Sequence, residues 1–193
     1  MSFKDLVLRN RSYRRFDEAH SLDRETLVDL VDCARQVPSG SNLQALRYIV
    51  SCAPEMNSNI FATLAWAAYL PEWPGPEPGE RPTGYIVIVT PEPLGDITRV
   101  DLGIAAQTIV LGAAARGLGG CMFANIKRTA LRKLLSLPEN MAIPLVIALG
   151  KPVEKVVLEE VGGDGSIRYY RTADGEHHVP KRSLEEVLLQ VHD

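Results

Sequence analysis

Four of the chain's 21 Lys and Arg residues lie within seven positions near the N-terminus: Arg9, Arg11, Arg14 and Arg15. A guanidinium group presents a planar fork of N–H donors that matches two oxygens of a phosphate, and Ser12 adds a hydroxyl between the arginines. The cluster therefore indicates a binding site for a phosphate group. Considered alone, such a run of charge is also typical of a solvent-exposed helix end, and this second interpretation stays open.

The overall composition is that of a globular protein with one domain. The chain has 193 residues, of which 46% are hydrophobic and 23% charged, and its formal net charge is -3. A nucleic-acid-binding protein usually carries a large excess of basic residues, so nucleic acid is not expected as a partner. The most apolar stretch, residues 101–116, is interrupted by Gln107 and Thr108 and is too short to span a bilayer. Neither a membrane partner nor a signal sequence is expected.

The cysteines and histidines show no spacing typical of a disulfide framework or a metal site. Three widely separated cysteines suit free thiols in the reducing cytoplasm. Adjacent His177 and His178 would point to opposite faces of a strand, so we expect no metal ligands there. The cysteines are Cys33, Cys52 and Cys121, and the other two histidines are His20 and His192.

Hydrophobic periodicity and turn residues predict a mixture of helices and strands. Asp23 is expected to cap the second helix. The helices are predicted at residues 2–9, 22–36, 55–69, 97–116, 129–135 and 184–191. The strands are predicted at residues 47–52, 84–90, 119–124 and 142–150, before a hairpin over 167–179 that turns at Asp174-Gly175.

The helix predicted at residues 97–116 is apolar on nearly all sides between Leu102 and Ala115. We therefore expect it to be buried on every side. In a chain of this size, that burial is easiest if a second subunit covers one side of the helix. A charge introduced at Ala106 or Val110 is accordingly expected to break a dimer.

Two irregular segments carry groups that suit ligand binding. Residues 71–82 contain five prolines and also Trp73, and so long an irregular loop is predicted to be a functional lid, with a passive linker as the alternative. Residues 38–44, PSGSNLQ, offer backbone donors, hydroxyls and amides to a flat ligand, and Gly40 would let that ligand approach the backbone closely. A plain helix-ending turn is the alternative for this second segment.

A glycine-rich segment, residues 117–120, joins the long helix to a strand. A dinucleotide-binding fingerprint follows a strand and opens a helix, so this segment has the opposite context. It is predicted to cap the helix C-terminus, to direct backbone N–H groups at a ligand, or to do both.

Together, these segments resemble the flavin-dependent nitroreductase family. The resemblance rests on the order of five motifs at residues 11–16, 34–44, 101–107, 117–120 and 181–182, and it covers essentially the whole chain. It implies an α+β sandwich in which a mainly antiparallel sheet lies between helices. It also implies a single domain over 1–193 and an intertwined homodimer with two FMN molecules at its interface. Residues 153–193 would wrap around the other subunit.

The resemblance also assigns FMN-binding residues. Lys181 or Arg182 would assist at the phosphate, and the chemistry would be centred on the flavin with no catalytic side chain. The FMN phosphate would be held by Arg11, Ser12 and Arg14. The isoalloxazine ring would be contacted from the partner subunit by Pro38, Ser39, Gly40 and Asn42, and by backbone N–H groups at Gly119 and Gly120.

The implied activity is an oxidoreductase reaction with a ping-pong order. NADH or NADPH would reduce the flavin and leave, and a nitroaromatic, quinone or related small molecule would then be reduced. Trp66, Tyr69 and Trp73 are expected to face this substrate, with core packing as the alternative for Trp66. The alternatives for function are a flavin-binding redox sensor or carrier with little turnover, and a dehalogenase or flavin-destroying relative on the same fold.

Overall fold

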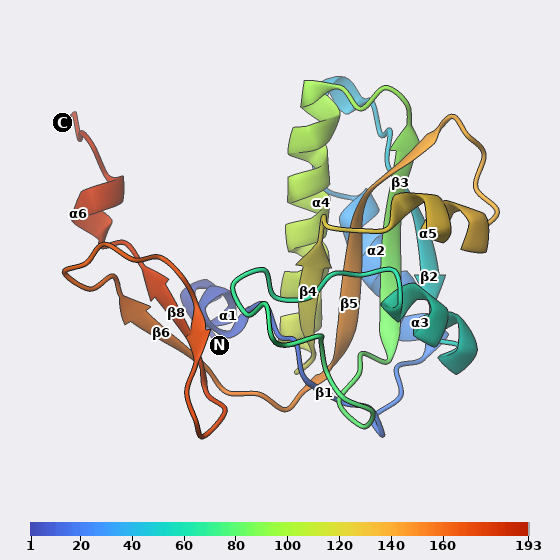
Figure 1. Cartoon of the computed structure of the whole chain (residues 1–193). Helices are drawn as coiled ribbons and strands as arrows, with labels where there is room; N and C mark the ends of the chain where they lie inside the picture. The colour runs from blue at the N-terminus through green and yellow to red at the C-terminus, as the bar shows by residue number, and fades with distance from the viewer. Residues whose placement is uncertain (193) are drawn as a thin grey trace. The chain divides into compact units, whose positions relative to one another are not determined.

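The computed structural model describes residues 1–192, which divide into two compact units (Figure 1). Residues 1–66 and 75–153 form one, here called the core unit. Residues 67–74 and the chain from Glu154 onward form the other, here called the C-terminal unit. The proline-rich segment expected to act as one lid is therefore shared between the two units.

The core unit is built on a five-stranded antiparallel sheet. Its strand order is β1-β5-β3-β2, and β4 also pairs with β5. The bounds are Phe16–Asp17 for β1, Arg47–Ser51 for β2, Gly84–Pro91 for β3, Gly119–Phe123 for β4 and Met141–Pro152 for β5. The expectation of an α+β fold with an antiparallel sheet is confirmed. The short β1 was not predicted, because two residues carry no periodicity.

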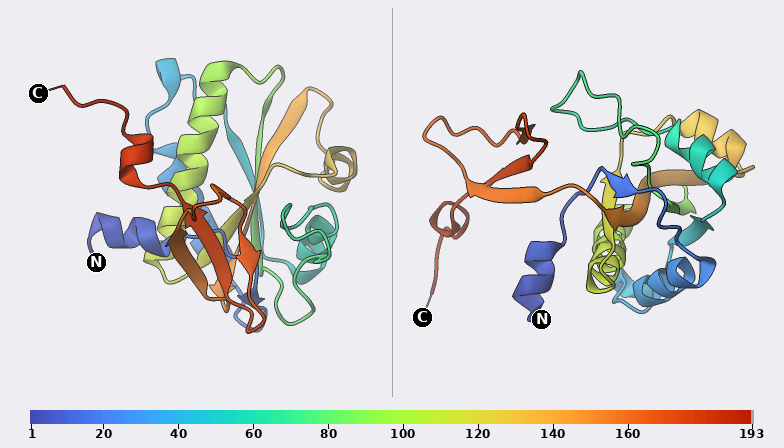
Figure 2. Two further views of the ribbon diagram at one scale, coloured as in Figure 1. Left: turned by 60° about the vertical axis from the view of Figure 1, so that its left-hand side comes forward. Right: turned by 90° about the horizontal axis from the view of Figure 1, so that it is seen from below.

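Helices cover both faces of this sheet (Figure 2). On one face α2 and α4 pack on β3 and β5, and their contact buries Leu30, Ile86, Ile109 and Ile147. On the other face lie α3 and α5. The bounds are Phe3–Arg9 for α1, Arg24–Arg35 for α2, Gly40–Asn42 for the 3-10 turn η1, Pro54–Phe61 for α3, Asp96–Ala115 for α4 and Arg128–Leu134 for α5.

Local capping explains where two of these helices begin and end. The Asp23 carboxylate accepts a hydrogen bond of 2.7 Å from the backbone N–H of Thr26, so the predicted cap of α2 is confirmed. Gly117 follows α4 in the left-handed region with φ +74°, and the Leu118 N–H donates to the Ala113 carbonyl at 2.9 Å. This is the glycine C-cap that the sequence predicted.

Within its own chain the long helix α4 is buried on one face only, and burial of the other face by a second subunit stays a prediction. One face lies in the core of its own chain, where Ala106 and Val110 are 1% and 4% exposed. The opposite face is open: Ile97, Val100 and Ile104 are 48%, 63% and 38% exposed. Ala106 and Val110 were therefore the wrong positions for probing a dimer, because a charge there would disrupt the chain's own core. By length and composition α4 could cross a bilayer, a test that core helices also pass.

The helix expected at residues 55–69 is wrong beyond Phe61, where α3 ends. The chain then pairs with a distant segment: the Ala65 N–H donates to the Asn125 carbonyl, and the Lys127 N–H donates to the Thr63 carbonyl. These long-range hydrogen bonds replace the helical ones, and sequence periodicity contains no information about them.

The C-terminal unit contains a separate three-stranded sheet. Val156–Glu160 form β6, which runs parallel to β8 at His177–Lys181, and Tyr170–Arg171 form β7, which runs antiparallel to β8. The predicted hairpin between β7 and β8 is confirmed, and Gly175 lies in its turn with φ +86°. The final helix, α6, is shorter than expected and spans Leu184–Val187.

The outer edge of β4 is occupied by the segment that follows α1. Ser12 forms a parallel bridge with Gly120, and the Tyr13 N–H donates to the Gly120 carbonyl at 3.1 Å. The Tyr13 ring lies directly on Gly119, where an added Cβ atom would come within 2.5 Å of the ring. Glycine at position 119 therefore allows the N-terminal segment to pack against the sheet.

Gly119→Ala is expected to lower the free energy of unfolding by about 1–3 kcal/mol, because the new methyl group must displace the Tyr13 ring. Urea denaturation would measure the loss. Gly163→Ala is the matched control, since a Cβ atom there meets nothing within 4 Å. Equal stability of the two variants would contradict this account of the β4 edge.

Candidate functional site

Arg11 is a half-buried cation without a matching anion among residues 1–192. Its Nη2 donates to the Val7 carbonyl at 2.7 Å. Its Nε is buried and has no hydrogen-bond partner among residues 1–192, and within the same residues Arg11 forms no ion pair. A buried donor without an acceptor is costly, and a phosphate oxygen would satisfy it. The residues present therefore fit an anionic phosphate group at this position.

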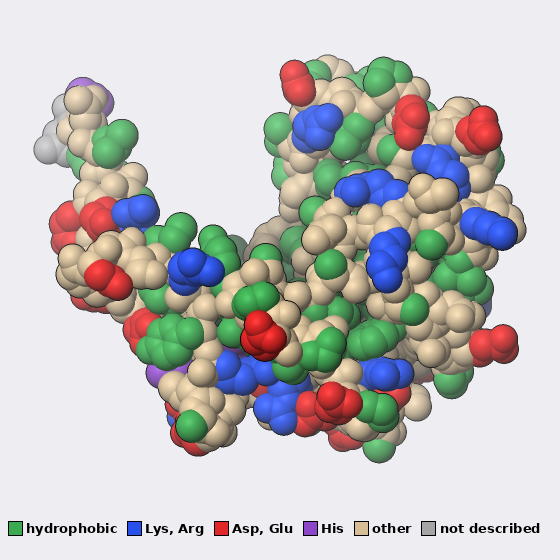
Figure 3. Space-filling view, in the orientation of Figure 1, with side chains coloured by type: hydrophobic (Ala, Val, Ile, Leu, Met, Phe, Trp, Pro, Cys, Tyr) green, Lys and Arg blue, Asp and Glu red, His purple; other side chains and the backbone are tan. Residues whose placement is uncertain are grey.

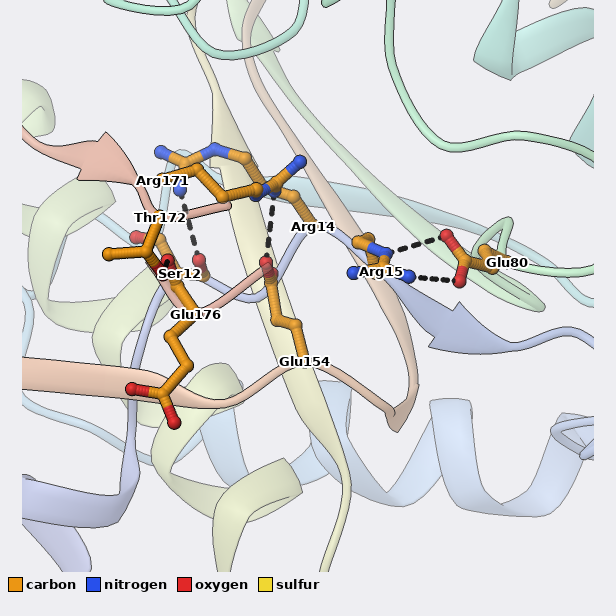
Figure 4. Close-up of polar contacts among 8 residues, drawn as sticks. All are labelled: Ser12, Arg14, Arg15, Glu80, Glu154, Arg171, Thr172 and Glu176. Carbon is orange, nitrogen blue, oxygen red and sulfur yellow. Dashed lines mark hydrogen bonds and ion pairs between the residues drawn. The ribbon is translucent and has the colours of Figure 1, made fainter. Parts of the chain in front are cut away.

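The other arginines of the N-terminal cluster differ in their partners. Arg15 forms a two-pronged pair with the Glu80 carboxylate at 2.6 and 2.5 Å, so its charge is already neutralised (Figure 4). Arg14 donates through Nη1 to the Ser12 carbonyl at 3.2 Å, which draws its guanidinium over the Ser12 backbone. Arg9 is exposed in the last turn of α1. The cluster is thus not a uniform basic patch.

The structure brings the arginine segment together with the glycine strand. Ser12 and Tyr13 lie along Gly119 and Gly120 on the outer edge of β4. Both glycines are buried. A Cβ atom on Gly120 would come within 3.2 Å of both Val110 and the Ala148 carbonyl oxygen, so a side chain there would force these neighbours to shift. Two of the predicted sets of site residues are therefore neighbours.

The loop at residues 38–44 is held by a buried carboxylate from α4. Asp101 is 5% exposed and accepts hydrogen bonds from the Ser39 hydroxyl at 2.7 Å and the Gly40 N–H at 2.9 Å. From the sequence, Asp101 belongs to one of the five motifs but has no assigned role. Its position was nevertheless informative, because an acid on the inner face of an apolar helix needs nearby donors.

The same loop contains three non-glycine residues in the left-handed region: Ser41 at φ 51°, Asn42 at φ 54° and Gln44 at φ 47°. Each such conformation costs on the order of 1 kcal/mol, and these conformations concentrate at ligand-binding positions. Pro38 and Asn42 are exposed, whereas Ser39 is half-buried beside Asp101. The loop therefore presents a strained but firmly anchored surface.

One chain does not bring this loop to the glycine strand. Gly40 lies against Ile97 and Asp101, near the start of α4, whereas Gly120 lies against Val110. Those α4 positions are nine to thirteen residues apart, which at 1.5 Å per residue places them about 14–20 Å apart. Figure 1 shows η1 beside the N-terminal end of α4 and β4 beside its lower part. The loop and the glycine strand of one chain therefore lie at different levels along α4.

With this geometry in place, comparison with known proteins assigns the chain to a family. A model of the nitroreductase family matches residues 7–151, well over half of the chain. The chain belongs to the nitroreductase family. The matched region contains the arginine cluster, the strained loop, α4 and the glycine strand.

Individual nitroreductase relatives are distant in sequence. Protein DrgA of a Synechocystis strain is 24% identical over 177 residues, covering 78% of this chain and 84% of that protein. An NADPH-flavin oxidoreductase of Vibrio harveyi is 25% identical over 165 residues, and the match spans 77% of this chain and 65% of that protein.

Solved structures share the nitroreductase fold. A putative NADH dehydrogenase/NAD(P)H nitroreductase from Bacteroides thetaiotaomicron aligns with a TM-score of 0.68 at 20% identity, covering 98% of this chain and 96% of that one. Iodotyrosine deiodinase bound to FMN and 3-iodo-L-tyrosine aligns with a TM-score of 0.65 at 18% identity, covering 78% of this chain and 90% of that one.

The three aromatic residues expected at the substrate lie in different surroundings. Trp66 belongs to the core unit and is 8% exposed, with its ring 5.3 Å from Phe61 and 4.6 Å from Phe123 between centroids. This burial favours the packing alternative for Trp66. Tyr69 and Trp73 belong to the C-terminal unit.

Within the C-terminal unit, arginines stack on these aromatic rings. The Arg168 guanidinium lies 5.0 Å from the Tyr69 ring centre, and the Arg171 guanidinium lies 4.5 Å from that of Trp73. Arg171 also pairs with Glu154 at 3.2 Å, and the Glu154 side chain is fully buried. The expected phosphate helpers, Lys181 and Arg182, follow in the same unit, where Arg182 pairs with Glu186 at 3.2 Å.

Two positioning residues were missed by the sequence analysis, Tyr13 and Asp101. Tyr13 fixes the arginine segment through its ring on Gly119, its backbone bond to Gly120 and a hydroxyl bond of 3.0 Å to the Arg9 carbonyl. An aromatic residue inside a basic run was the available signal for it. Each of these residues anchors one of the two separated segments.

Asp101→Ala is expected to lower the free energy of unfolding by about 2–4 kcal/mol, because the Ser39 hydroxyl and Gly40 N–H both lose a charged acceptor. The substitution should also accelerate hydrogen exchange more in residues 39–44 than in the sheet. Asp101→Asn keeps one acceptor oxygen and should lose less. Unchanged exchange in this loop for Asp101→Ala would contradict the anchoring role.

Proposed function

We propose that this nitroreductase-family chain is an FMN-dependent oxidoreductase that works as a homodimer. NADH or NADPH donates a hydride, and nitroaromatic, quinone or related small molecules accept the electrons in a ping-pong order. The observation that carries the proposal is the half-buried Arg11, whose Nε has no acceptor among residues 1–192 and whose segment lies along the glycine strand. The flavin and NADPH in the names of distant relatives support the choice of cofactor and donor.

The phosphate end of FMN is assigned to Arg11, Ser12 and Arg14. Arg11 offers its unsatisfied Nε, and Ser12 is exposed at the start of the β4 edge. Two guanidinium groups offset the cost of removing a phosphate dianion from water. Lys181 or Arg182 adds a further positive charge in this proposal. Arg15 is excluded from the role, because Glu80 already neutralises it.

The isoalloxazine ring is assigned to the glycine strand of one chain and the strained loop of the other. The backbone of Gly119 and Gly120 already pairs with β5 and with the Ser12 segment, so in this arrangement the two glycines set the position of that segment beside the ring. Pro38, Ser39, Gly40 and Asn42 of the partner subunit contact the ring. When bound, FMN supplies the redox chemistry of the reaction. The protein binds the phosphate, orients the ring between two chains and excludes water from it.

The three free cysteines support a reducing, cytoplasmic location for this enzyme. A flavin-binding sensor or carrier would bind FMN with the same residues but would turn over slowly. Steady-state oxidation of NADH and NADPH with a quinone acceptor separates these functions. Purified protein that is colourless and takes up no added FMN would overturn the proposal as a whole.

Arg11→Ala is expected to weaken FMN binding by about 1.5–3 kcal/mol, the contribution of a charge-assisted hydrogen bond. Arg14→Ala should have a similar effect. Arg9→Ala is the matched control and should change little, because Arg9 is exposed at the end of α1. Fluorescence titration of flavin-free protein measures all three, and equal losses would indicate a diffuse basic patch instead of a site.

Ile104→Asp is expected to separate the dimer and release FMN together. Ile104 lies on the open face of α4, where hydrophobic side chains reach the surface (Figure 3), and a carboxylate there cannot be buried between two chains. Light scattering after size-exclusion chromatography measures the mass. Val28→Asp, which alters an exposed residue of α2, is the control. A stable monomer that retains equimolar FMN would refute the split site.

Trp73→Ala is expected to change the relative rates with different acceptors while FMN affinity stays nearly the same. In the proposal, Tyr69 and Trp73 form a substrate-facing surface, and the Arg171 guanidinium on the Trp73 ring restricts its motion. Turnover with a quinone and a nitroaromatic would be compared. Unchanged ratios, or loss of FMN, would show that this segment is structural.

A further inference from the structure

A hollow of about 290 Å³ lies beneath the strained loop, between α2, β2 and α4. Its volume is close to the lower limit of pockets that hold small organic ligands. Small or aliphatic side chains form the apolar part of its lining, among them Val31, Ala34, Ala45, Leu46 and Ala105. An apolar hollow of this kind accommodates flat apolar groups.

The polar groups around this hollow differ in whether their charges are already paired. Arg47 is exposed and donates through Nη1 to the carbonyls of Gln44 and Leu46 at 2.7 and 2.8 Å. Arg47 forms no ion pair with any residue from 1 to 192. The neighbouring Arg35 is already paired with Asp32 at 2.6 Å. Arg47 thus leaves one uncompensated positive charge beside the hollow.

Two further ionisable groups line the hollow. The Asp101 carboxylate is buried, and both of its oxygens already accept hydrogen bonds from the loop. Burial raises the pKa of the Tyr48 phenol, which also lines the hollow. An anionic ligand would therefore place its charge near Arg47 and away from Asp101, with its apolar part inside.

The hollow and the loop share residues, and hydrogen bonds from the lining hold the loop. Ser39 and Gln44 belong both to its lining and to the loop. Asp101 holds the loop at Ser39, and Arg47 holds it at the Gln44 carbonyl. The three left-handed residues lie between or beside these anchors. A molecule bound in the hollow would therefore contact the loop that contains the three left-handed residues.

We propose that this hollow is a second ligand site, which takes a flat aromatic carboxylic acid of one or two fused rings. The rings fill the space among Val31, Leu46 and Ala105, and the carboxylate pairs with Arg47. The occupant shifts the loop at residues 38–44. The effect of this shift on the flavin rests on the proposed function, in which the loop of one subunit contacts the flavin ring bound by its partner.

The direct test is calorimetric titration of the full-length protein with 2-naphthoate. Binding in the micromolar range is expected. Val31→Phe and Leu46→Trp place larger side chains in the hollow, and each should weaken binding at least about tenfold. Val28→Phe makes the same change as Val31→Phe at an exposed position of α2 outside the lining, and should bind like the natural sequence.

The role of Arg47 is tested with a neutral analogue. Arg47→Gln should weaken 2-naphthoate about tenfold and leave naphthalene-2-carboxamide unaffected, because only the acid uses the charge. Arg47→Lys should restore part of the loss. Absence of naphthoate binding to the natural sequence would overturn the site. Equal binding by Val31→Phe and Leu46→Trp would also overturn it, since the ligand would then lie elsewhere.

The connection to the loop is tested by the visible spectrum of bound flavin. Naphthoate should perturb that spectrum, and FMN should change naphthoate affinity by the same factor that naphthoate changes FMN affinity. An unchanged spectrum at saturating naphthoate would refute the connection. If the protein binds no FMN, the proposed function fails, whereas titration with naphthoate still decides whether the hollow is a ligand site.

Discussion

The fixed length of α4 is the constraint on which the candidate site depends. The helix is rigid along its 20 residues and carries the loop anchor, Asp101, near one end and the contact with the glycine strand, Val110, further along. No side-chain movement can close the separation between these points within one chain. One face of α4 packs in the core of its own chain, and the other face is apolar and exposed. The association of two chains that we propose would account for both features.

Charge pairing determines what the N-terminal arginines can do. Glu80 removes Arg15 from ligand binding, and the α1 backbone takes up only one donor of Arg11. The composition of the cluster is therefore less important than the distribution of acceptors around it. The same reasoning separates Arg47 from Arg35 beside the hollow under the loop, because Arg35 pairs with Asp32 and no carboxylate among residues 1–192 pairs with Arg47. In both places the functional candidate is the cation that the described residues leave uncompensated.

Much of the fold could be predicted from the sequence, because the signals involved are local. Neighbouring residues alone contain the signal for the strands over residues 84–90 and 142–150, the cap at Asp23 and the glycine after α4. The errors concern interactions between distant segments. The helix expected to continue past Phe61 was replaced by pairing with residues 125–127. Periodicity showed that α4 is apolar all round but could not tell which of its faces its own sheet would cover.

The separation of the two binding segments along α4 has a genetic consequence. In the proposed dimer, each site combines the arginine segment of one chain with the loop of the other. An allele that damages Arg11 and an allele that damages the Ser39 loop would each be defective alone. Expressed in one cell, their mixed dimers would contain one intact site and one doubly damaged site. Two such loss-of-function alleles would therefore complement each other within a single gene.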